Sequence, residues 1–279
     1  MNRTMITATN TLSQLQKRMD IISNNMSNVQ TNGYKRKETY FTDLLAQEFQ
    51  NQGRPDKEKG RLTPDGIRVG TGAKLSQSRM VLTQGSLKTT DRDLDVALTK
   101  DNLFFKIRGD QNRTAYTRDG AFYLTPAGNG GNSMALVTGN GSAVLDEQDR
   151  PIVINGEIDN LIFNENGQLR ATMQNGDVQA FNLGIVSVKK PHFLEQQGTN
   201  LYTLPGGLNR LGVTEDEVFT QLNGGLRNQI SLQQGSLENS NVDLSKEMTD
   251  LLNVQRSYQF QSRSITQADQ MAGLVNGIR

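Results

Sequence analysis

The sequence predicts an α+β protein in which long N- and C-terminal helices pair in a coiled-coil-like core, with an antiparallel β domain inserted between them. Three observations predict this class: apolar residues recur every three or four positions at both ends, short alternating runs between glycine turns fill the middle, and strands do not alternate with helices. We expect four parts: an N-terminal helix over 1–36, an extension and linker over 37–73, a mainly-β domain over 74–232 and a C-terminal helix over 233–279.

A heptad pattern marks the first thirty residues. The spacing of its apolar residues alternates between four and three, which is typical of a helix–helix seam. The pattern stops at Asn32 and Gly33, which favour the left-handed conformation that ends a helix. An amphipathic helix packed on its own domain is the simpler interpretation, but the narrow stripe and its amide-rich flanks favour contact with another chain. The seam residues are Met1, Met5, Ala8, Leu12, Leu15, Met19, Ile22, Met26 and Val29.

A second long helix is predicted from about 241 to 276. Ser240 or Asn241 is a plausible N-cap, and Gly277 stands where a helix ends. Because an isolated amphipathic helix cannot bury its own stripe, we expect the two helices to pair and their remaining apolar surface to contact neighbouring subunits. The apolar residues of this helix, with Gln261 filling one gap, are Leu244, Met248, Leu251, Val254, Tyr258, Ile265, Ala268, Ala272 and Val275.

The middle of the chain, from about residue 68 to 225, has the texture of antiparallel strands joined by tight turns. Before it lies the segment 40–73, whose start looks helical and whose charged part, 51–60, has no apolar anchors and is expected to be mobile until it contacts a neighbour. Five glycines of the β region are predicted to occupy turn positions with positive φ, namely Gly120, Gly139, Gly156, Gly167 and Gly176.

One six-residue motif occurs twice. Residues 82–87 read LTQGSL and residues 232–237 read LQQGSL, and the similarity extends to an aspartate and a leucine further on. The first copy lies near the start of the β domain and the second lies at its end. We therefore expect the two glycine turns to lie side by side where the chain enters and leaves this domain. Chance similarity in a sequence rich in Gly, Ser and Gln is the alternative.

The composition excludes several function classes. With 30 Lys and Arg against 29 Asp and Glu, the net charge of +1 argues against nucleic-acid binding through charge alone. Cysteine is absent, so disulfides and thiolate metal sites are excluded. No apolar run of about 18 residues exists and the N-terminus lacks an apolar signal core, so we expect neither membrane insertion nor an ordinary cleaved signal peptide.

No arrangement of residues predicts catalysis. Asp91, Asp93 and Asp95 alternate as in a calcium loop, but Val96 stands where that loop needs glycine and Asn102 where it needs glutamate. A solvated strand edge is the simpler interpretation of the three aspartates. The single histidine, His192, has no serine elbow to act on, and no phosphate-binding loop is complete. We expect no catalytic site, no metal site and no cofactor.

Three ordered blocks resemble the signatures of bacterial flagellar axial proteins, the family of rod and hook subunits. Residues 22–36, ISNNMSNVQTNGYKR, resemble the N-terminal signature, residues 234–271 resemble the C-terminal block, and TQGSLKTTDRDLDVAL with AYTRDGAF resembles the central one. In the central block Phe104 and Phe105 are kept, although the family's nearby glycines are absent. The positions that match the terminal signatures are Asn24, Asn25, Asn28, Thr31, Gly33, Tyr34, Lys35, Arg256 and Tyr258.

The resemblance implies a structural subunit of the flagellar basal-body rod, and the length together with segment 40–73 is similar to distal rod proteins or their proximal-rod relatives. It implies export through the flagellar channel without signal cleavage, followed by self-assembly of terminal helices that are disordered in the monomer. The implied partners are copies of the chain, neighbouring rod and hook subunits and the export apparatus, with no nucleic acid. A secreted β-rich adhesin or binding module with helical tails is the alternative.

Overall fold

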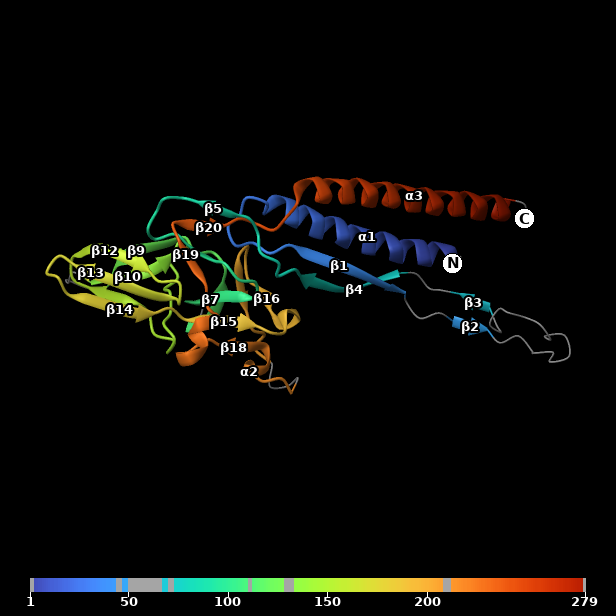
Figure 1. Cartoon of the computed structure of the whole chain (residues 1–279). Helices are drawn as coiled ribbons and strands as arrows, with labels where there is room; N and C mark the ends of the chain where they lie inside the picture. The colour runs from blue at the N-terminus through green and yellow to red at the C-terminus, as the bar shows by residue number, and fades with distance from the viewer. Residues whose placement is uncertain are drawn as a thin grey trace, which may run out of the picture. The chain divides into compact units, whose positions relative to one another are not determined.

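The computed structural model describes residues 3–43, 47–49, 67–69, 73–109, 112–127, 133–207 and 212–277. Long helices lie at both ends of the chain and the part between them is rich in strands, which confirms the predicted α+β class (Figure 1). The chain divides into two compact units. Unit 1 comprises Met1–Asn24, Lys37–Arg79 and Ser245–Arg279, and unit 2 comprises Asn25–Arg36 and Met80–Leu244.

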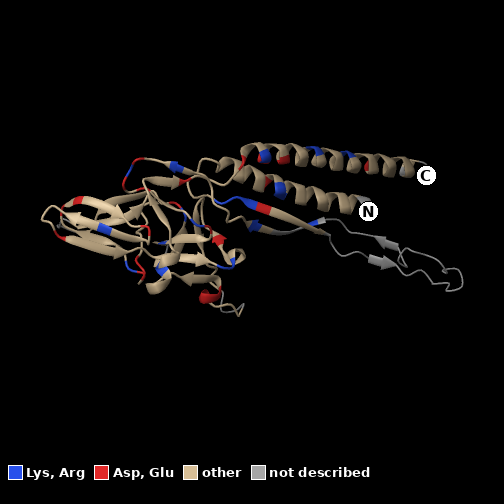
Figure 2. Cartoon of the chain, viewed as in Figure 1, with Lys and Arg blue, Asp and Glu red and all other residues tan. Residues whose placement is uncertain are grey.

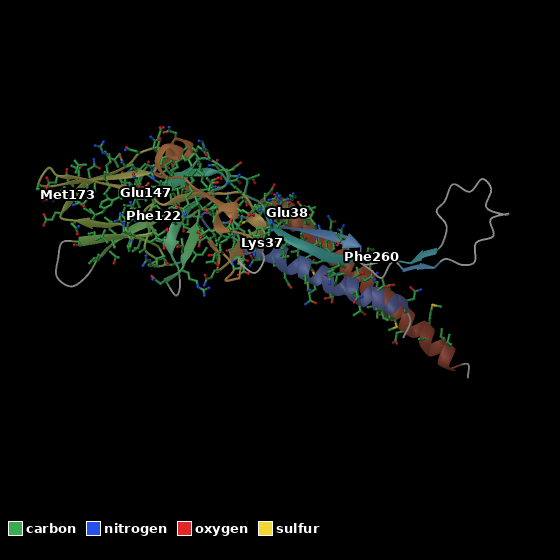
Figure 3. All side chains as sticks on the ribbon, turned by 90° about the horizontal axis from the view of Figure 1, so that it is seen from below. Lys37, Glu38, Phe122, Glu147, Met173 and Phe260 are labelled. Carbon is green, nitrogen blue, oxygen red and sulfur yellow. The ribbon has the colours of Figure 1, made fainter. Side chains whose placement is uncertain are left out.

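Unit 1 is built on the two long helices, α1 (Arg3–Ser27) and α3 (Leu244–Gly277). They run side by side in opposite directions, so that the described ends of α1 and α3 near the two termini lie at the same end of the pair (Figures 1 and 3). A two-stranded sheet of β1 (Lys37–Asp43) and β4 (Ala73–Met80) belongs to the same unit. The short strands β2 (Gln47–Phe49) and β3 (Ile67–Val69) pair antiparallel, with Glu48 opposite Arg68.

The predicted helix at the start of segment 40–73 is wrong, because residues 40–43 belong to strand β1. The sequence around Tyr40 and Phe41 contains β-favouring aromatic and threonine residues, and the pairing partner β4 lies more than thirty positions further along the chain. Residues 50–66, which include the whole charged part 51–60 that was predicted to be mobile, lie outside the described residues.

Unit 2 is centred on a six-stranded sheet in the order β16-β17-β8-β7-β15-β18. Its strands are β16 (Glu195–Gln196), β17 (Leu201–Thr203), β8 (Thr114–Thr117), β7 (Leu103–Arg108), β15 (Ile185–Val188) and β18 (Phe219–Gln221). All neighbouring strands for which a register is resolved run antiparallel, with Phe105 of β7 facing Thr117 of β8 on one side and Ile185 of β15 on the other.

Two three-stranded antiparallel sheets and two short strand pairs complete unit 2. One sheet has the order β11-β10-β9 and the other β12-β13-β14, and the pairs are β19-β6 and β20-β5. Short helical turns, η2 (Pro191–Phe193), α2 (Glu215–Val218) and η4 (Gly224–Gln229), connect strands. The bounds are β5 (Leu87–Thr89), β6 (Val96–Leu98), β9 (Phe122–Pro126), β10 (Ser133–Thr138), β11 (Val153–Asn155), β12 (Ile158–Phe163), β13 (Gln168–Met173), β14 (Val178–Asn182), β19 (Leu232–Gln234) and β20 (Ser236–Glu238).

The core of unit 2 lies on both faces of strand β7. Successive side chains of a strand point to opposite faces, so Phe105 and Ile107 enter one hydrophobic cluster while Phe104 enters another. Phe105 meets Phe122 edge-on at 5.2 Å between ring centroids, and Phe104 meets Tyr202 at 5.5 Å. A strand buried on both faces reads as an apolar run rather than an alternating one, which is the pattern of LFF in β7.

The predicted turn glycines divide into two groups. Gly156, Gly167 and Gly176 have positive φ, as predicted, whereas Gly120 and Gly139 do not. At Gly120 the requirement is a close approach of two backbones, because a Cβ there would lie 1.7 Å from the carbonyl oxygen of Val96. Glycine is therefore needed at 120 for space rather than for backbone conformation.

Candidate functional site

The predicted seam residues of the N-terminal segment lie mostly on one side of α1 and its continuation. Ile22 is buried, together with Ala8 of the same stripe. The remaining described members are half-buried, namely Met5, Leu12, Leu15, Met19, Met26 and Val29. Val29 lies beyond the end of α1 at Ser27, so the helix is shorter than the predicted 1–36.

The shielded residues of α3 follow a heptad pattern in which Glu247, rather than the predicted Met248, is covered. Asp250 is half-buried as well, and the other seven alternate in steps of four and three, beginning at Glu247, which is 5 % exposed. They are Glu247, Leu251, Val254, Tyr258, Gln261, Ile265 and Ala268. The extra three-residue step in the predicted stripe arose from assigning this place to Met248, which is 47 % exposed.

Other apolar side chains of α3 are open to solvent. Phe260 is 70 % exposed, and Figure 3 labels it on the helix. Of the predicted stripe, Leu244 and Met248 at the start and Ala272 and Val275 at the end are exposed as well. The large exposed apolar residues of this helix are Leu244, Met248, Leu252, Phe260, Met271, Leu274 and Val275. A helix of a soluble monomer rarely carries so many, so these residues are candidates for contact with another chain.

The residues that match the N-terminal signature are mostly buried in unit 2. Asn24 is exposed and Thr31 is half-buried, whereas Asn25, Asn28, Gly33, Tyr34 and Lys35 are buried. The Tyr34 hydroxyl donates a hydrogen bond to Oδ1 of Asn25 at 3.1 Å. The signature therefore folds back on itself. In the C-terminal block Arg256 is exposed and Tyr258 is half-buried.

A buried charge cluster joins three distant segments of unit 2. Glu238 accepts a hydrogen bond from Nζ of Lys35 at 2.7 Å through Oε1, and from Nε of Arg118 at 2.6 Å through Oε2. The side chains of all three residues are at most 1 % exposed. Oε1 of Glu238 also accepts from the backbone N–H of Gly85 at 2.8 Å. One carboxylate thus binds two cations and a backbone amide, and the cluster carries a net positive charge.

This environment lowers the pKa of Lys35 to about 8, since burial disfavours its charged form and the positive charge of Arg118 adds to the effect. The negative charge of Glu238 and its hydrogen bond to Lys35 act in the opposite direction and raise this pKa. The Lys35 ammonium also donates to the carbonyl oxygen of Thr83 at 2.7 Å, which fixes its position from a second side. The Lys35 ammonium therefore contacts two distant chain segments, one at Thr83 and one at Glu238.

The ends of the two copies of the repeated motif lie in neighbouring segments, although the two glycine turns do not lie opposite each other as predicted. Strand β5 runs antiparallel to β20, with Leu237 opposite Lys88 and Glu238 opposite Leu87. The two glycines have different tasks, however. Gly235 has a φ of +69° in open space, whereas a Cβ on Gly85 would lie 2.0 Å from the carbonyl oxygen of Asn239.

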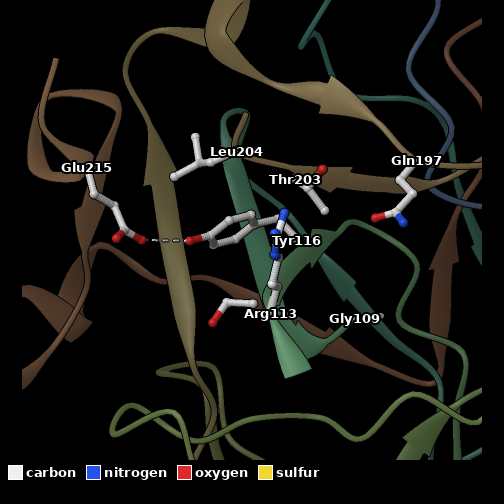
Figure 4. Close-up of a pocket in the computed structure, with 8 residues that line it drawn as sticks. Gly109, Arg113, Tyr116, Gln197, Thr203, Leu204 and Glu215 are labelled. Atoms are coloured by element: carbon white, nitrogen blue, oxygen red, sulfur yellow. Dashed lines mark hydrogen bonds between the residues drawn. The ribbon is translucent and has the colours of Figure 1, made fainter. Parts of the chain in front are cut away.

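A polar pocket of about 480 Å³ opens beside β8 (Figure 4). The hydroxyl of Tyr116 donates to Oε1 of Glu215 at 3.0 Å. Burial raises the pKa of Tyr116 well above its ordinary value, and the negative charge of Glu215 adds to this, so the phenol stays protonated. The pocket is lined by Gly109, Arg113, Thr114, Tyr116, Gln197, Thr203, Leu204 and Glu215.

The three aspartates of the calcium-like stretch do not form a solvated edge throughout. Asp95 is 4 % exposed and accepts a hydrogen bond from Nη1 of Arg92 at 3.2 Å. Within the described part of the chain, no three His, Asp or Glu side chains gather in a way that could hold a metal ion. Charged residues of both signs are interspersed over both units rather than gathered by sign (Figure 2).

Family models match three parts of the chain. Residues 5–35 match the flagella basal body rod protein model, residues 100–171 match the flagellar hook protein FlgE/F/G D1 domain, and residues 233–278 match the C-terminal model of flagellar basal body rod FlgEFG proteins. These ranges contain Lys35, Arg118 and Glu238, one in each. Among the described helices, none has the length and apolar character needed to cross a membrane.

Curated relatives match the whole length of the chain. The flagellar hook-basal body complex protein FlhP of Bacillus subtilis is 47 % identical over 281 residues, covering 100 % of both chains. The flagellar basal-body rod protein FlgG of Agrobacterium fabrum is 34 % identical and covers 94 % of this chain and 93 % of its own. The FlgG of Bacillus subtilis is 30 % identical, with 99 % of each chain covered.

Proposed function

Because the chain belongs to the family of flagellar basal-body rod and hook proteins, we propose that this structural subunit of the basal body self-assembles through its terminal helices into the helical tube of the rod after export. The observation that carries the proposal is the exposed apolar surface of α3. Its proposed partners are further copies of the chain, neighbouring rod and hook subunits and the export apparatus, without nucleic acid or membrane insertion.

Coiled-coil-like pairing of α1 and α3 supplies the first layer of this assembly. The heptad spacing in both helices supports such pairing. At about 1.5 Å per residue, α1 with 25 residues is about 37 Å long and α3 with 34 residues about 51 Å. The last two or three turns of α3 therefore extend past the described part of α1, which accounts for the exposure of Ala272 and Val275.

Neighbouring copies supply the second layer. Leu252 and Phe260 lie outside the heptad seam of α3 and are 54 % and 70 % exposed. In a helical polymer each subunit presents one surface to the copy ahead and another to the copy behind, so an apolar face left open in the monomer is covered in the filament. Burial of such side chains contributes about 1.5–3 kcal/mol each.

A substitution on this face tests the proposal. In the purified full chain, Phe260→Ser is expected to raise the concentration needed for filament formation, measured by sedimentation and electron microscopy. The matched control is Leu226→Ser, because Leu226 is also exposed, at 43 %, but lies in η4 of unit 2. Filaments that form equally well with Phe260→Ser would contradict the role of α3.

The four-part division at 1–36, 37–73, 74–232 and 233–279 remains part of the proposal, with the central part forming the outer layer of the tube. The extension is proposed to bridge neighbours and to stiffen the rod. Deleting residues 51–60 is then expected to give softer or curved filaments by electron microscopy, and unchanged stiffness would count against the bridge.

We propose a structural rather than a catalytic role for the whole chain. The alternative, a secreted β-rich adhesin or binding module with helical tails, is separated from it by truncation. A chain that lacks residues 1–30 and 245–279 should lose assembly if it is a rod subunit but keep binding activity if it is an adhesin. Circular dichroism of the dilute monomer should show less helix than the assembled form.

A further inference from the structure

We propose that Lys35, Arg118 and Glu238 form a latch that folds residues 25–36 into unit 2 before assembly and thereby preforms the last turn of α1 as a helix nucleus. This inference rests on the proposed assembly. It adds that the folded part of the monomer starts at Asn25, inside α1, and not after residue 36. It follows from contacts that lie entirely within unit 2.

A chain of contacts leads from the latch to the last turn of α1. Glu238 holds the segment twice, since its carboxylate binds Lys35 and its backbone carbonyl accepts the N–H of Gly33 at 2.8 Å. Next to them, the Tyr34 hydroxyl binds the side chain of Asn25. The carbonyl of Asn25 in turn accepts the N–H of Asn28 at 3.2 Å, which closes the turn.

Backbone packing leaves this segment little freedom to move away. Gly33 has a φ of +69°, and a Cβ there would lie 2.5 Å from the amide nitrogen of Asp119, directly after Arg118. The segment is therefore seated against the same residue that supplies the second cation of the latch. No larger side chain fits at 33 without displacing one of the two backbones.

The residues before α3 are held at the same place. The backbone N–H of Arg36 donates to Oδ1 of Asn241 at 2.8 Å, and Nδ2 of Asn241 donates to the carbonyl oxygens of Val81 and Thr83, each at 2.9 Å. Asn241 precedes the first residue of α3, Leu244, by one turn. Arg36 and Asn241 are thus hydrogen-bonded to each other within unit 2.

The benefit of a preformed turn follows from the cooperativity of helix formation. Starting a helix fixes several dihedral angles for a single hydrogen bond and is unfavourable by a factor of about 1,000, whereas each further residue adds its own bond. A turn already held by the latch removes this barrier. Contact with a neighbouring subunit then has only to extend α1 toward its N-terminus.

Hydrogen exchange in the dilute full-length chain tests the latch directly. In the wild type, the amides of residues 25–36 are expected to be protected while those of residues 5–20 exchange at least tenfold faster. Glu238→Gln leaves two buried cations without their carboxylate, and it should speed exchange at Gly33, Asn28 and Arg36 at least tenfold. The amides of Leu169 and Met173 in the remote strand β13 should not change.

Two further variants make the test specific. Glu38→Gln is the matched control, because it makes the same chemical change at a half-buried glutamate whose carboxylate lies 4.0 Å from Nζ of the exposed Lys246. Lys35→Met keeps the Arg118–Glu238 pair and serves if Glu238→Gln does not fold. The latch is overturned if residues 25–36 exchange as fast as residues 5–20 in the wild type, or if neither latch variant alters their exchange.

Seeded assembly separates this inference from the proposed function. With wild-type seeds and equal amounts of folded subunit, the latch variants should elongate filaments more than tenfold slower than the wild type and the Glu38→Gln control. Equal elongation rates would overturn the latch while leaving the assembly proposal standing. A wild-type chain that never elongates seeds would instead contradict the assembly proposal, and the exchange measurement would still decide whether residues 25–36 are latched.

Discussion

Nε of Arg118 lies 2.6 Å from Oε2 of Glu238, and neither side chain has any exposure to solvent. Arg118 also donates through Nη1 to the carbonyl oxygens of Lys100 and Leu103, each at 3.1 Å. A planar guanidinium with five donors makes these bonds together, whereas an ammonium on a shorter reach does not. The Arg118–Glu238 pair therefore joins the central β region to the C-terminal signature by a buried ion pair.

Arg118→Lys is expected to lower the free energy of unfolding by about 2–4 kcal/mol, because the charge stays but the bonds to backbone carbonyls are lost. Urea unfolding followed by circular dichroism measures the change. Arg150→Lys is the control, since Arg150 is 69 % exposed in its pair with Asp146 and should change stability by less than about 0.5 kcal/mol. Equal small effects would show that the bonds of Arg118 to backbone carbonyls are unimportant.

The two repeated glycines should respond differently to the same substitution. Gly85→Ala is expected to lower the free energy of unfolding by about 3 kcal/mol, because the new Cβ meets the backbone of Asn239. Gly235→Ala meets no atom within 4 Å but keeps a left-handed backbone, which costs about 1–2 kcal/mol. Thermal unfolding of both variants beside Gly225→Ala, which has neither constraint, gives the order, and a larger effect at 235 than at 85 would contradict it.

The stability of the protein should rise with pH just above neutrality through Lys35. Its folded pKa of about 8 lies below the ordinary lysine value of 10.5. Between these values the unfolded chain binds more protons than the folded one, so the free energy of unfolding increases by up to about 1.4 kcal/mol per pH unit. Below pH 8 the lysine is charged in both states, and this contribution to the pH dependence disappears.

The measurement is the difference in urea-unfolding free energy between wild type and Lys35→Met from pH 7 to 9.5. We expect the wild type to gain on the variant as pH rises, and a flat difference would refute the lowered pKa. The range stops at 9.5 because burial raises the pKa values of Tyr116 and Tyr202. Tyrosines in the unfolded chain ionise near pH 10. Their ionisation would lower the free energy of unfolding as pH rises, which is opposite to the effect of Lys35.

Tyr116 should remain protonated in alkaline solution as long as the protein is folded. Its phenol is buried and bonded to Glu215, so a wild type minus Tyr116→Phe difference spectrum should show no phenolate absorbance at 295 nm up to pH 11. The same variant should lose about 1 kcal/mol of stability, the usual effect of one hydrogen bond. Phenolate absorbance near pH 10 in the folded protein would contradict the buried assignment.

Periodicity predicted the existence of both long helices but not the register of the second. The spacing of apolar residues in α1 is regular, and the helix appears where predicted. In α3 the first covered position is occupied by Glu247, and a search for apolar residues passes over a carboxylate. The predicted stripe therefore included the adjacent Met248, which is exposed, in place of Glu247.

The charge cluster could not be predicted because its members are far apart in the chain. Lys35 and Arg118 each stood in a recognised signature, yet nothing local indicates that their side chains meet. One signal was present in the repeated motif, since the residue after Gln-Gly-Ser-Leu is Lys88 in the first copy and Glu238 in the second. That difference marks where the two copies stop being equivalent. Strand β1 was missed for the same reason, because its partner is distant.

The bond between Lys35 and Glu238 joins residues 203 positions apart, which sets the order in which the molecule can fold. Closing so long a loop is slower than forming local contacts. A chain released gradually from either end therefore cannot close this bond until everything between the two residues has emerged. The contacts of Lys35 with Glu238 therefore form late, and a partly released chain lacks them.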